Sequence, residues 1–290
     1  MEKVDRTARF LTSRGLTQTQ ALRAISLHVM LSSYSHEMME SKIQWLSTLG
    51  LSHEKINDVI VRHPNVLGLA FDRLDALVDW YISHGVSQEK MAYVFNVFPA
   101  GVSLSIEENL DVKVDFLKEE VGCSYDQVAR ILTAAPQMLA CSLERLQTNV
   151  RCLEELGVPS DKLPAMIALV PQCLNLKSTR IKETVDAMDE MFGSGAGIEA
   201  LIKNCRIVMH NISGMRRSYK YLLSVGFTKE RLEQNTRFLM RNANRLLRPR
   251  VQFLKSKGVD VVDDVSWILM PEGRFVHKYP DYSARLKKNM

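Results

Sequence analysis

The chain has 290 residues, of which 46% are hydrophobic and 24% are charged, and its formal net charge at pH 7 is +5. These proportions are ordinary for a soluble folded protein. The longest uncharged stretch, residues 91–106, contains Pro99 and Gly101. It is shorter than the about 18 apolar residues that a membrane-spanning helix needs, which excludes such a helix.

The N-terminus does not have the pattern of a secretory signal. Two of its first five residues are acidic, and residues 1–10 contain no continuous apolar segment. The segment is also a poor organellar transit peptide, so we expect the numbering to start at a mature or truncated end. The five cysteines form no C-x-x-C pair and have no histidine at ligand spacing, which predicts reduced core thiols and no metal site.

A glycine and a proline recur together about every 35 residues along the chain. The proline follows the glycine by 14 residues in four copies, and an apolar residue follows the proline by three. The glycines are Gly50, Gly85, Gly122 and Gly157, the prolines are Pro64, Pro99, Pro136 and Pro171, and the apolar residues are Leu67, Val102, Leu139 and Leu174. A fixed period of this length predicts a repeat solenoid.

Each unit reads as a helix, a short turn that begins at the proline, and a longer second helix. Apolar residues at 6, 9, 10 and 13 positions after the glycine form one helical face. Ser52, Ser87 and Ser124 stand at the expected N-caps, and Thr17 with Gln20 fits a capping box. The proline ends the first helix, and the next glycine ends the second.

Weaker copies extend the repeat in both directions. Gly15 opens one without the proline, while Gly193, with Arg206 at the proline position, Gly226 and Gly258 open later ones. We therefore expect an all-α superhelical solenoid of about eight units. It should span residues 1–274 as a single domain and be followed by a basic C-terminal tail, residues 275–290.

The repeat resembles that of the mTERF family, the mitochondrial transcription termination factor proteins of organelles. Leu49-Gly50-Leu51 with His63-Pro64-Asn65-Val66-Leu67 carries the resemblance, as does Leu156-Gly157-Val158 with Val170-Pro171-Gln172-Cys173-Leu174. The segment from Asn244 to Lys255, which contains Arg248-Pro249-Arg250, is similar to a late helix start of the family. The similarity covers about residues 10–270.

The resemblance implies a left-handed superhelix in which each unit has two α-helices and a short 3₁₀ turn. It also implies a location in mitochondria or chloroplasts and a concave groove that binds nucleic acid. Members act in transcription termination, RNA maturation, splicing or ribosome assembly. They use no cofactor and catalyse no reaction alone.

Basic residues concentrate near the C-terminus. From Lys203 to Gly258 there are fourteen Lys or Arg and two Glu, which leaves a formal charge of −7 for the rest of the chain. Such an asymmetry is typical of a phosphate-binding surface. The candidate nucleic-acid contacts are Arg206, Arg216, Arg217, Lys220, Arg237, Arg241, Arg245, Arg248, Arg250 and Lys255. Tyr219, Tyr221 and Phe238 could offer stacking faces. A solvated surface, or one that docks an acidic protein, remains an alternative.

No catalytic constellation emerges from the sequence. His36-Glu37 lacks the second histidine of a zinc-protease motif, and the glycines at 193, 195 and 197 lack the third glycine of a dinucleotide fingerprint. The sequence therefore predicts that the protein is not an enzyme and has no cofactor.

Two functions remain open. The first is an organellar protein that binds double-stranded DNA or structured RNA and acts by occupancy, in transcription termination or regulation or in RNA processing. The alternative is a structural or assembly component of an organellar ribonucleoprotein such as the mitochondrial ribosome. In that case, the acidic N-terminal repeats would contact ribosomal or transcription proteins.

Overall fold

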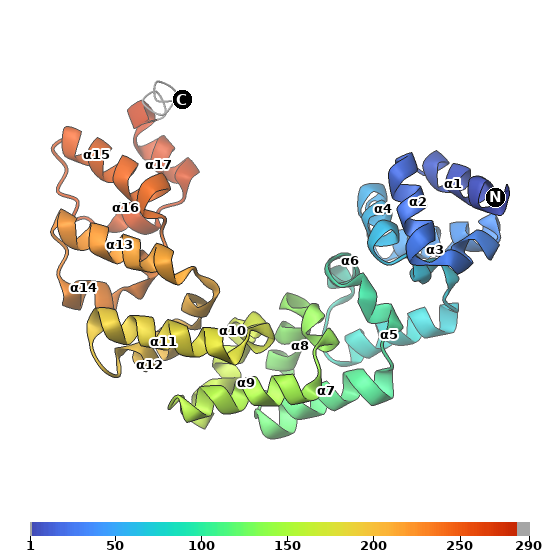
Figure 1. Cartoon of the computed structure of the whole chain (residues 1–290), viewed down its shortest axis with the longest axis horizontal. Helices are drawn as coiled ribbons and strands as arrows, with labels where there is room; N and C mark the ends of the chain where they lie inside the picture. Colours follow the sequence, from blue (N-terminus) through green and yellow to red (C-terminus); the bar gives the residue numbers. More distant parts are fainter. Residues whose placement is uncertain (1, 283–290) are drawn as a thin grey trace. The chain divides into compact units, whose positions relative to one another are not determined.

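The computed structural model describes residues 2–282, in which all regular structure is helical (Figure 1). The chain forms two compact units. Unit 1 comprises Met1–Val150 and Ser160–Asn175, and unit 2 comprises Arg151–Pro159 and Leu176–Met290. None of the described helices is long and apolar enough to cross a membrane.

A helix, a 3₁₀ turn and a second helix recur along both units. The first helices are α2 (Gln18–Leu27), α4 (His53–Arg62), α6 (Met91–Val97), α8 (Tyr125–Ala134), α10 (Leu163–Leu169), α12 (Ala196–Lys203) and α14 (Lys229–Gln234). Short 3₁₀ turns, η3 (Gln88–Lys90) and η8 (Ser160–Lys162), lead into α6 and α10. The connecting 3₁₀ turns are η1 (Val29–Ser33), η2 (Pro64–Gly68), η4 (Pro99–Ser103), η7 (Pro136–Ala140), η9 (Pro171–Asn175), η10 (Cys205–Met209) and η11 (Thr236–Phe238).

The second helices are longer and end near the next glycine. They are α3 (His36–Thr48), α5 (Phe71–Ser83), α9 (Leu143–Glu155), α11 (Ser178–Phe192) and α13 (Ile212–Val225). Two others contain π-helical segments: η5 (Ile106–Asp111), α7 (Val112–Asp115) and η6 (Phe116–Glu120) form one, and η12 (Ala243–Leu247) and α15 (Arg248–Ser256) form the other. The helix α1 (Glu2–Ser13) precedes the first copy, and α16 (Ser266–Leu269) and α17 (Glu272–Lys278) follow the last.

The four prolines occupy equivalent places, as the sequence predicts. Each is the first residue of a 3₁₀ turn and follows a residue with φ between −147° and −132° and ψ between 56° and 70°. The repeat glycines adopt φ between +81° and +96°, a conformation that disfavours other residues and so explains their recurrence at helix ends. The Thr17–Gln20 capping box is present, but the Ser87 side chain makes no capping hydrogen bond.

The proline position of the sixth copy was assigned one residue too late. The turn η10 begins at Cys205, which is buried like the four prolines, whereas Arg206 is exposed as the second residue of the turn. The glycine-to-proline spacing is one residue shorter in this copy, so counting from Gly193 misplaced the turn.

The core of unit 1 runs between successive copies. The first helices pack in sequence, α2 on α4, α4 on α6 and α8 on α10, and the turns η1 and η2, η4 and η7, and η7 and η9 contact each other. The residues three positions after the prolines fill this stack. Leu67, Leu139 and Leu174 are fully buried, and Val102 is nearly so.

We predict that replacing Leu67, Leu139 or Leu174 with alanine costs about 3 kcal/mol each, because each substitution leaves a cavity where neighbouring copies meet. Chemical denaturation measures the loss. As a control, Leu169→Ala in the same unit should cost less than about 0.5 kcal/mol, because that side chain is 49% exposed. Losses below about 1 kcal/mol at all three buried positions would contradict their role.

The extra residues of the longest of these copies are absorbed by π-helical turns. Gly85 and Gly122 are 37 residues apart, two more than Gly50 and Gly85. Within this copy, the Leu110 amide donates to the Ser105 carbonyl (3.1 Å) and the Val121 amide to the Phe116 carbonyl (3.0 Å). Each bond spans five residues instead of four, so each π turn holds one additional residue.

The expected boundary at residue 274 falls within α17 of unit 2. Phe275 and Tyr282 are buried and pack against Phe253 with ring centroids 6.4 and 5.3 Å away. Residues 275–282 therefore belong to the packed unit. The rest of the expected basic tail, residues 283–290, lies outside the described residues.

Candidate nucleic-acid interface

The basic segment of the sequence forms most of unit 2, from the end of α12 to the end of α15. Eight of the ten candidate side chains are exposed, Arg241 is half-buried and Arg250 is fully buried. The exposed eight are Arg206, Arg216, Arg217, Lys220, Arg237, Arg245, Arg248 and Lys255.

Two of these cations occupy the same position in successive copies. Arg206 is the second residue of η10 and Arg237 the second residue of η11, and both are exposed. The corresponding residues of unit 1 are uncharged: Met30, Asn65, Ala100, Gln137 and Gln172. A positive charge at this position is therefore specific to unit 2.

The α13 cations differ in their availability. Arg216 forms an ion pair with Glu190 of α11, in which the two side chains are 44% and 63% exposed. Because exposed pairs contribute little stability, this contact is readily exchanged for a phosphate. Arg217 and Lys220 form no ion pair with a described residue.

The aromatic residues of the segment are already engaged within the protein. The Arg248 guanidinium covers the Tyr221 ring, with its carbon 4.6 Å from the ring centroid. Burial raises the pKa of Tyr221, and the Arg248 charge opposes this shift. The Tyr219 hydroxyl donates to the Met191 carbonyl (2.8 Å), and Phe238 is 3% exposed. The expectation that these rings offer open stacking faces is therefore wrong for Phe238 and unsupported for the two tyrosines.

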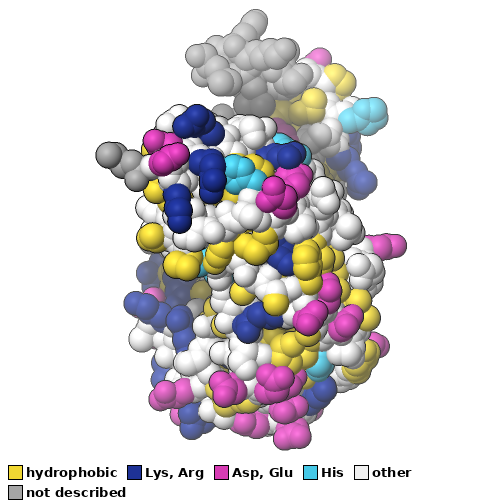
Figure 2. Space-filling model, turned by 90° about the vertical axis from the view of Figure 1, so that its right-hand side faces the viewer, with side chains coloured by type: hydrophobic (Ala, Val, Ile, Leu, Met, Phe, Trp, Pro, Cys, Tyr) yellow, Lys and Arg dark blue, Asp and Glu magenta, His cyan; other side chains and the backbone are white. Residues whose placement is uncertain are grey.

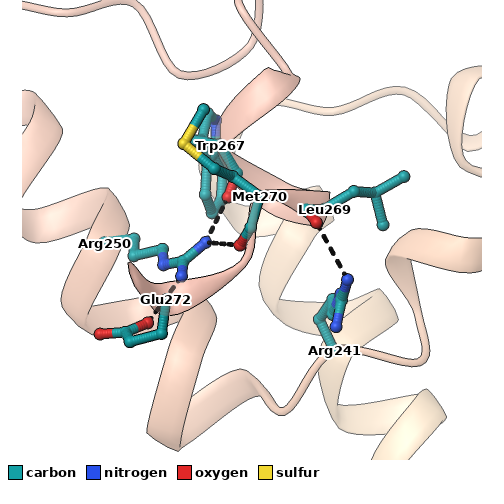
Figure 3. A network of polar contacts seen from close by, with 6 residues as sticks. All are labelled: Arg241, Arg250, Trp267, Leu269, Met270 and Glu272. Atoms are coloured by element: carbon teal, nitrogen blue, oxygen red, sulfur yellow. Dashed lines mark hydrogen bonds and ion pairs between the residues drawn. The ribbon is translucent and has the colours of Figure 1, made fainter. Parts of the chain in front are cut away.

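Arg250 has a structural role. Its Nη1 donates to the carbonyls of Trp267 (2.6 Å) and Met270 (2.7 Å), and its Nη2 pairs with Glu272 (2.6 Å), as Figure 3 shows. The guanidinium also lies 4.2 Å from the centroid of the Phe275 ring. With no exposed surface, Arg250 cannot contact a ligand, so it leaves the candidate set.

Arg241 supports the same segment from a second side. Its Nη2 donates to the Leu269 carbonyl (3.1 Å), also visible in Figure 3. The half-buried side chain keeps its remaining N–H groups for other partners. Arg241 and Arg250 thus fix residues 267–272, and only Arg241 can also reach a ligand.

The helix expected to start at Arg248 begins earlier. Asn242 caps it by accepting from the amides of Asn244 (3.0 Å) and Arg245 (2.8 Å), and the π turn η12 continues directly into α15. The Leu247 amide reaches back to the Asn242 carbonyl, five residues earlier, just before Pro249. The amides of residues 248–250 are therefore inside a helix and are not free to bind an anion.

A pocket lies between α13 and the start of η12. Its volume is about 220 Å³, and Arg217, Arg241 and three asparagines, Asn211, Asn242 and Asn244, are among the residues that line it. Burial, and secondarily the Arg241 charge, lowers the pKa of His210 in its wall. The asparagines were missed from the sequence, although Asn211 and Asn242 are the caps of the helices that frame the pocket.

Unit 1 has a different surface chemistry. Asp72, Asp75 and Asp79 follow one face of α5, and Glu107, Glu108, Asp115, Glu119 and Glu120 lie on the next second helix. Figure 2, which faces the N-terminal copies, shows acidic, basic and apolar side chains intermixed and no continuous basic surface. The candidate contacts are therefore confined to unit 2.

The described residues contain no group of three or more His, Cys, Asp or Glu that could hold a metal ion, and all five cysteines are free. A family model, mTERF, matches residues 1–83 and 72–275 of the chain. No curated protein matches the chain with significance.

Proposed function

The chain belongs to the mTERF family, and from this premise we propose that it is an organellar protein that binds double-stranded DNA or structured RNA through unit 2. It would act by occupancy, in transcription termination or regulation or in RNA processing. The observation that carries the proposal is the set of exposed cations on unit 2, most of them without an acidic partner. Lys and Arg at this density bind the phosphate backbone and release its counterions.

The proposed contacts are Arg206, Arg216, Arg217, Lys220, Arg237, Arg241, Arg245, Arg248 and Lys255. Their guanidinium groups suit bidentate contacts with phosphate oxygens. Open aromatic faces are scarce on this surface, so we propose that backbone contacts dominate over base stacking. This favours a duplex or a folded RNA over an extended single strand.

Mitochondria or chloroplasts are the proposed location, as for the family. Within this proposal the protein needs no cofactor and catalyses no reaction, because occupancy of a nucleic-acid site is sufficient to block or recruit other machinery.

The mixed and acidic surface of unit 1 favours a second candidate function. A chain that binds RNA through unit 2 and a protein through unit 1 would suit a structural or assembly component of an organellar ribonucleoprotein such as the ribosome. The acidic faces of α5 and of the following second helix would then contact basic ribosomal or transcription proteins.

Fluorescence anisotropy with duplex DNA, duplex RNA and single-stranded RNA of equal length tests the main proposal. We expect submicromolar binding to at least one duplex and weaker binding to the single strand. Absence of binding to all three below about 10 μM, which is weaker than ordinary non-specific binding at low salt, would reject it. Sedimentation of organellar extracts separates the two functions, because a ribosomal component migrates with the large particle at moderate salt and a free factor does not.

A further inference from the structure

An arginine fastens neighbouring copies together at three places in the chain. Arg73, Arg145 and Arg180 are each the third residue of a second helix, α5, α9 and α11. Arg73 donates to the carbonyls of Val102 (3.0 Å) and Leu104 (3.2 Å), Arg145 to that of Asn175 (2.6 Å), and Arg180 to that of His210. In every case the acceptor lies at the end of the next copy's 3₁₀ turn.

The third residue of α13 is Gly214. The carbonyl that an arginine would bind here is that of Arg241, which precedes the cap Asn242 as His210 precedes the cap Asn211. The buried Ser218 satisfies it instead, with its hydroxyl 2.5 Å away. The link between copies is thus kept by a short side chain, and the volume that an arginine fills elsewhere is empty.

Folding does not require glycine at this position. Gly214 does not have a positive φ. A Cβ atom here would meet only Asn211 atoms, at 3.6 and 3.8 Å, which are ordinary contacts. Glycine is among the least favourable residues in a helix. A local preference broken without a structural reason is expected at functional sites.

The absent side chain opens the pocket of about 220 Å³ described above, in which Gly214, Met215 and Met240 form part of the wall. This volume is several times the about 30 Å³ that one water occupies in the liquid, so the pocket has room for a tetrahedral anion and some water.

The lining has the chemistry of an anion site. It contains two guanidinium groups, those of Arg217 and Arg241, and no Asp or Glu. Arg217 has no ion pair with a described residue, while the hydrogen bond to Leu269 holds Arg241 in place. The exposed Asn244 adds an amide donor.

We propose that the pocket between α13 and η12, opened by Gly214, holds one phosphate group of the nucleic-acid strand bound to unit 2. The inference rests on the proposed nucleic-acid binding and assigns one anchoring point within it. A strand anchored here would have a fixed register on unit 2, whereas the exposed lysines and arginines nearby tolerate many positions of the backbone.

Gly214→Arg tests the pocket in a way that charge alone cannot imitate. The new side chain should fill the pocket and restore the link seen at Arg73, Arg145 and Arg180, so the variant should unfold no earlier than the wild type. The matched control, Ser224→Arg, adds the same charge at an exposed position of the same helix. Electrostatic attraction without a pocket predicts that both variants bind duplexes as tightly as the wild type or more tightly.

Loss of one charge-assisted phosphate contact predicts that Gly214→Arg binds about tenfold more weakly than Ser224→Arg. The slope of log K against log salt should be lower by about 0.9 on duplex DNA. Equal affinities of these two variants would overturn the pocket while leaving the proposed function intact, whereas failure of the wild type to bind any nucleic acid would reject the function itself.

Two further measurements cover a misfolded variant and a base in place of a phosphate. Arg217→Gln should show the same loss of slope without occluding the pocket, and wild-type affinity of this variant would also overturn the proposal. On single strands, where occupation of the pocket would still be measurable, the difference between Gly214→Arg and Ser224→Arg should persist when abasic nucleotides replace the bases. Its disappearance would mean that the pocket receives a base and would refute the phosphate assignment.

Discussion

Arg250→Ala should destabilise unit 2 by about 4 kcal/mol, because it leaves the buried carbonyls of Trp267 and Met270 without their donor and removes the partner of Glu272. Chemical denaturation followed by far-UV circular dichroism measures the loss. Arg250→Lys should restore only part of the stability, because an ammonium group cannot match the planar fork that reaches three acceptors.

The control for this prediction is Arg245→Ala, which removes an exposed arginine five residues away and should change stability by less than about 0.5 kcal/mol. Equal stabilities of the Arg250 and Arg245 variants would contradict the structural role of Arg250. Where enough Arg250→Ala protein remains folded, its affinity for nucleic acid should fall only in proportion to the folded fraction.

Binding to duplex DNA should weaken about a thousandfold between 50 and 200 mM salt if about six cations of unit 2 neutralise phosphates. Replacing Arg206, Arg217, Arg237 and Arg245 with Gln should reduce the salt slope by about 3.6, since each lost phosphate contact removes about 0.9. All four side chains are exposed and lie on three successive copies. Fluorescence anisotropy across a salt series measures the slope.

The matched control replaces four exposed cations of unit 1, Lys55, Lys90, Lys118 and Arg130, with Gln. It removes the same charge from the acidic half of the molecule and should leave most of the slope unchanged. A control variant that loses as much slope as the unit 2 variant would transfer the binding surface to unit 1. Arg241 and Arg250 are omitted from the test because a loss of folding would be mistaken for a loss of binding.

The turns of the solenoid were predictable because a few residues control them locally. A proline starts each of four 3₁₀ turns, a glycine with positive φ ends each preceding helix, and the leucines three residues after the prolines are buried, all as the spacing indicates. These features depend on backbone geometry within a few residues, which the sequence displays directly.

The role of Arg250 could not be read from the sequence, because it depends on carbonyls contributed 17 and 20 residues later. Arginine is rarely buried, so composition alone places it on the surface. The same limit applies to Arg73, Arg145 and Arg180, whose acceptors lie in the following copy. The equivalence of Gly214 to these arginines is visible only once the helix starts are aligned.

Cys205 illustrates a different limit, which is one of register. With the proline absent and the spacing changed by one residue, only the structure distinguishes the buried first position of the turn from the exposed second one. Correcting that single step makes Arg206 equivalent to Arg237.

The π turns η5 and η6 have a consequence for how such arrays change in evolution. Because each accommodates a single added residue within its own helix, an insertion there leaves the preceding Pro99 turn and the following Gly122 in their usual conformations. Copies can therefore drift in length one residue at a time without a frameshift of the whole stack. Searches that assume a constant period will lose such copies, whereas searches that allow short gaps inside the second helix will retain them.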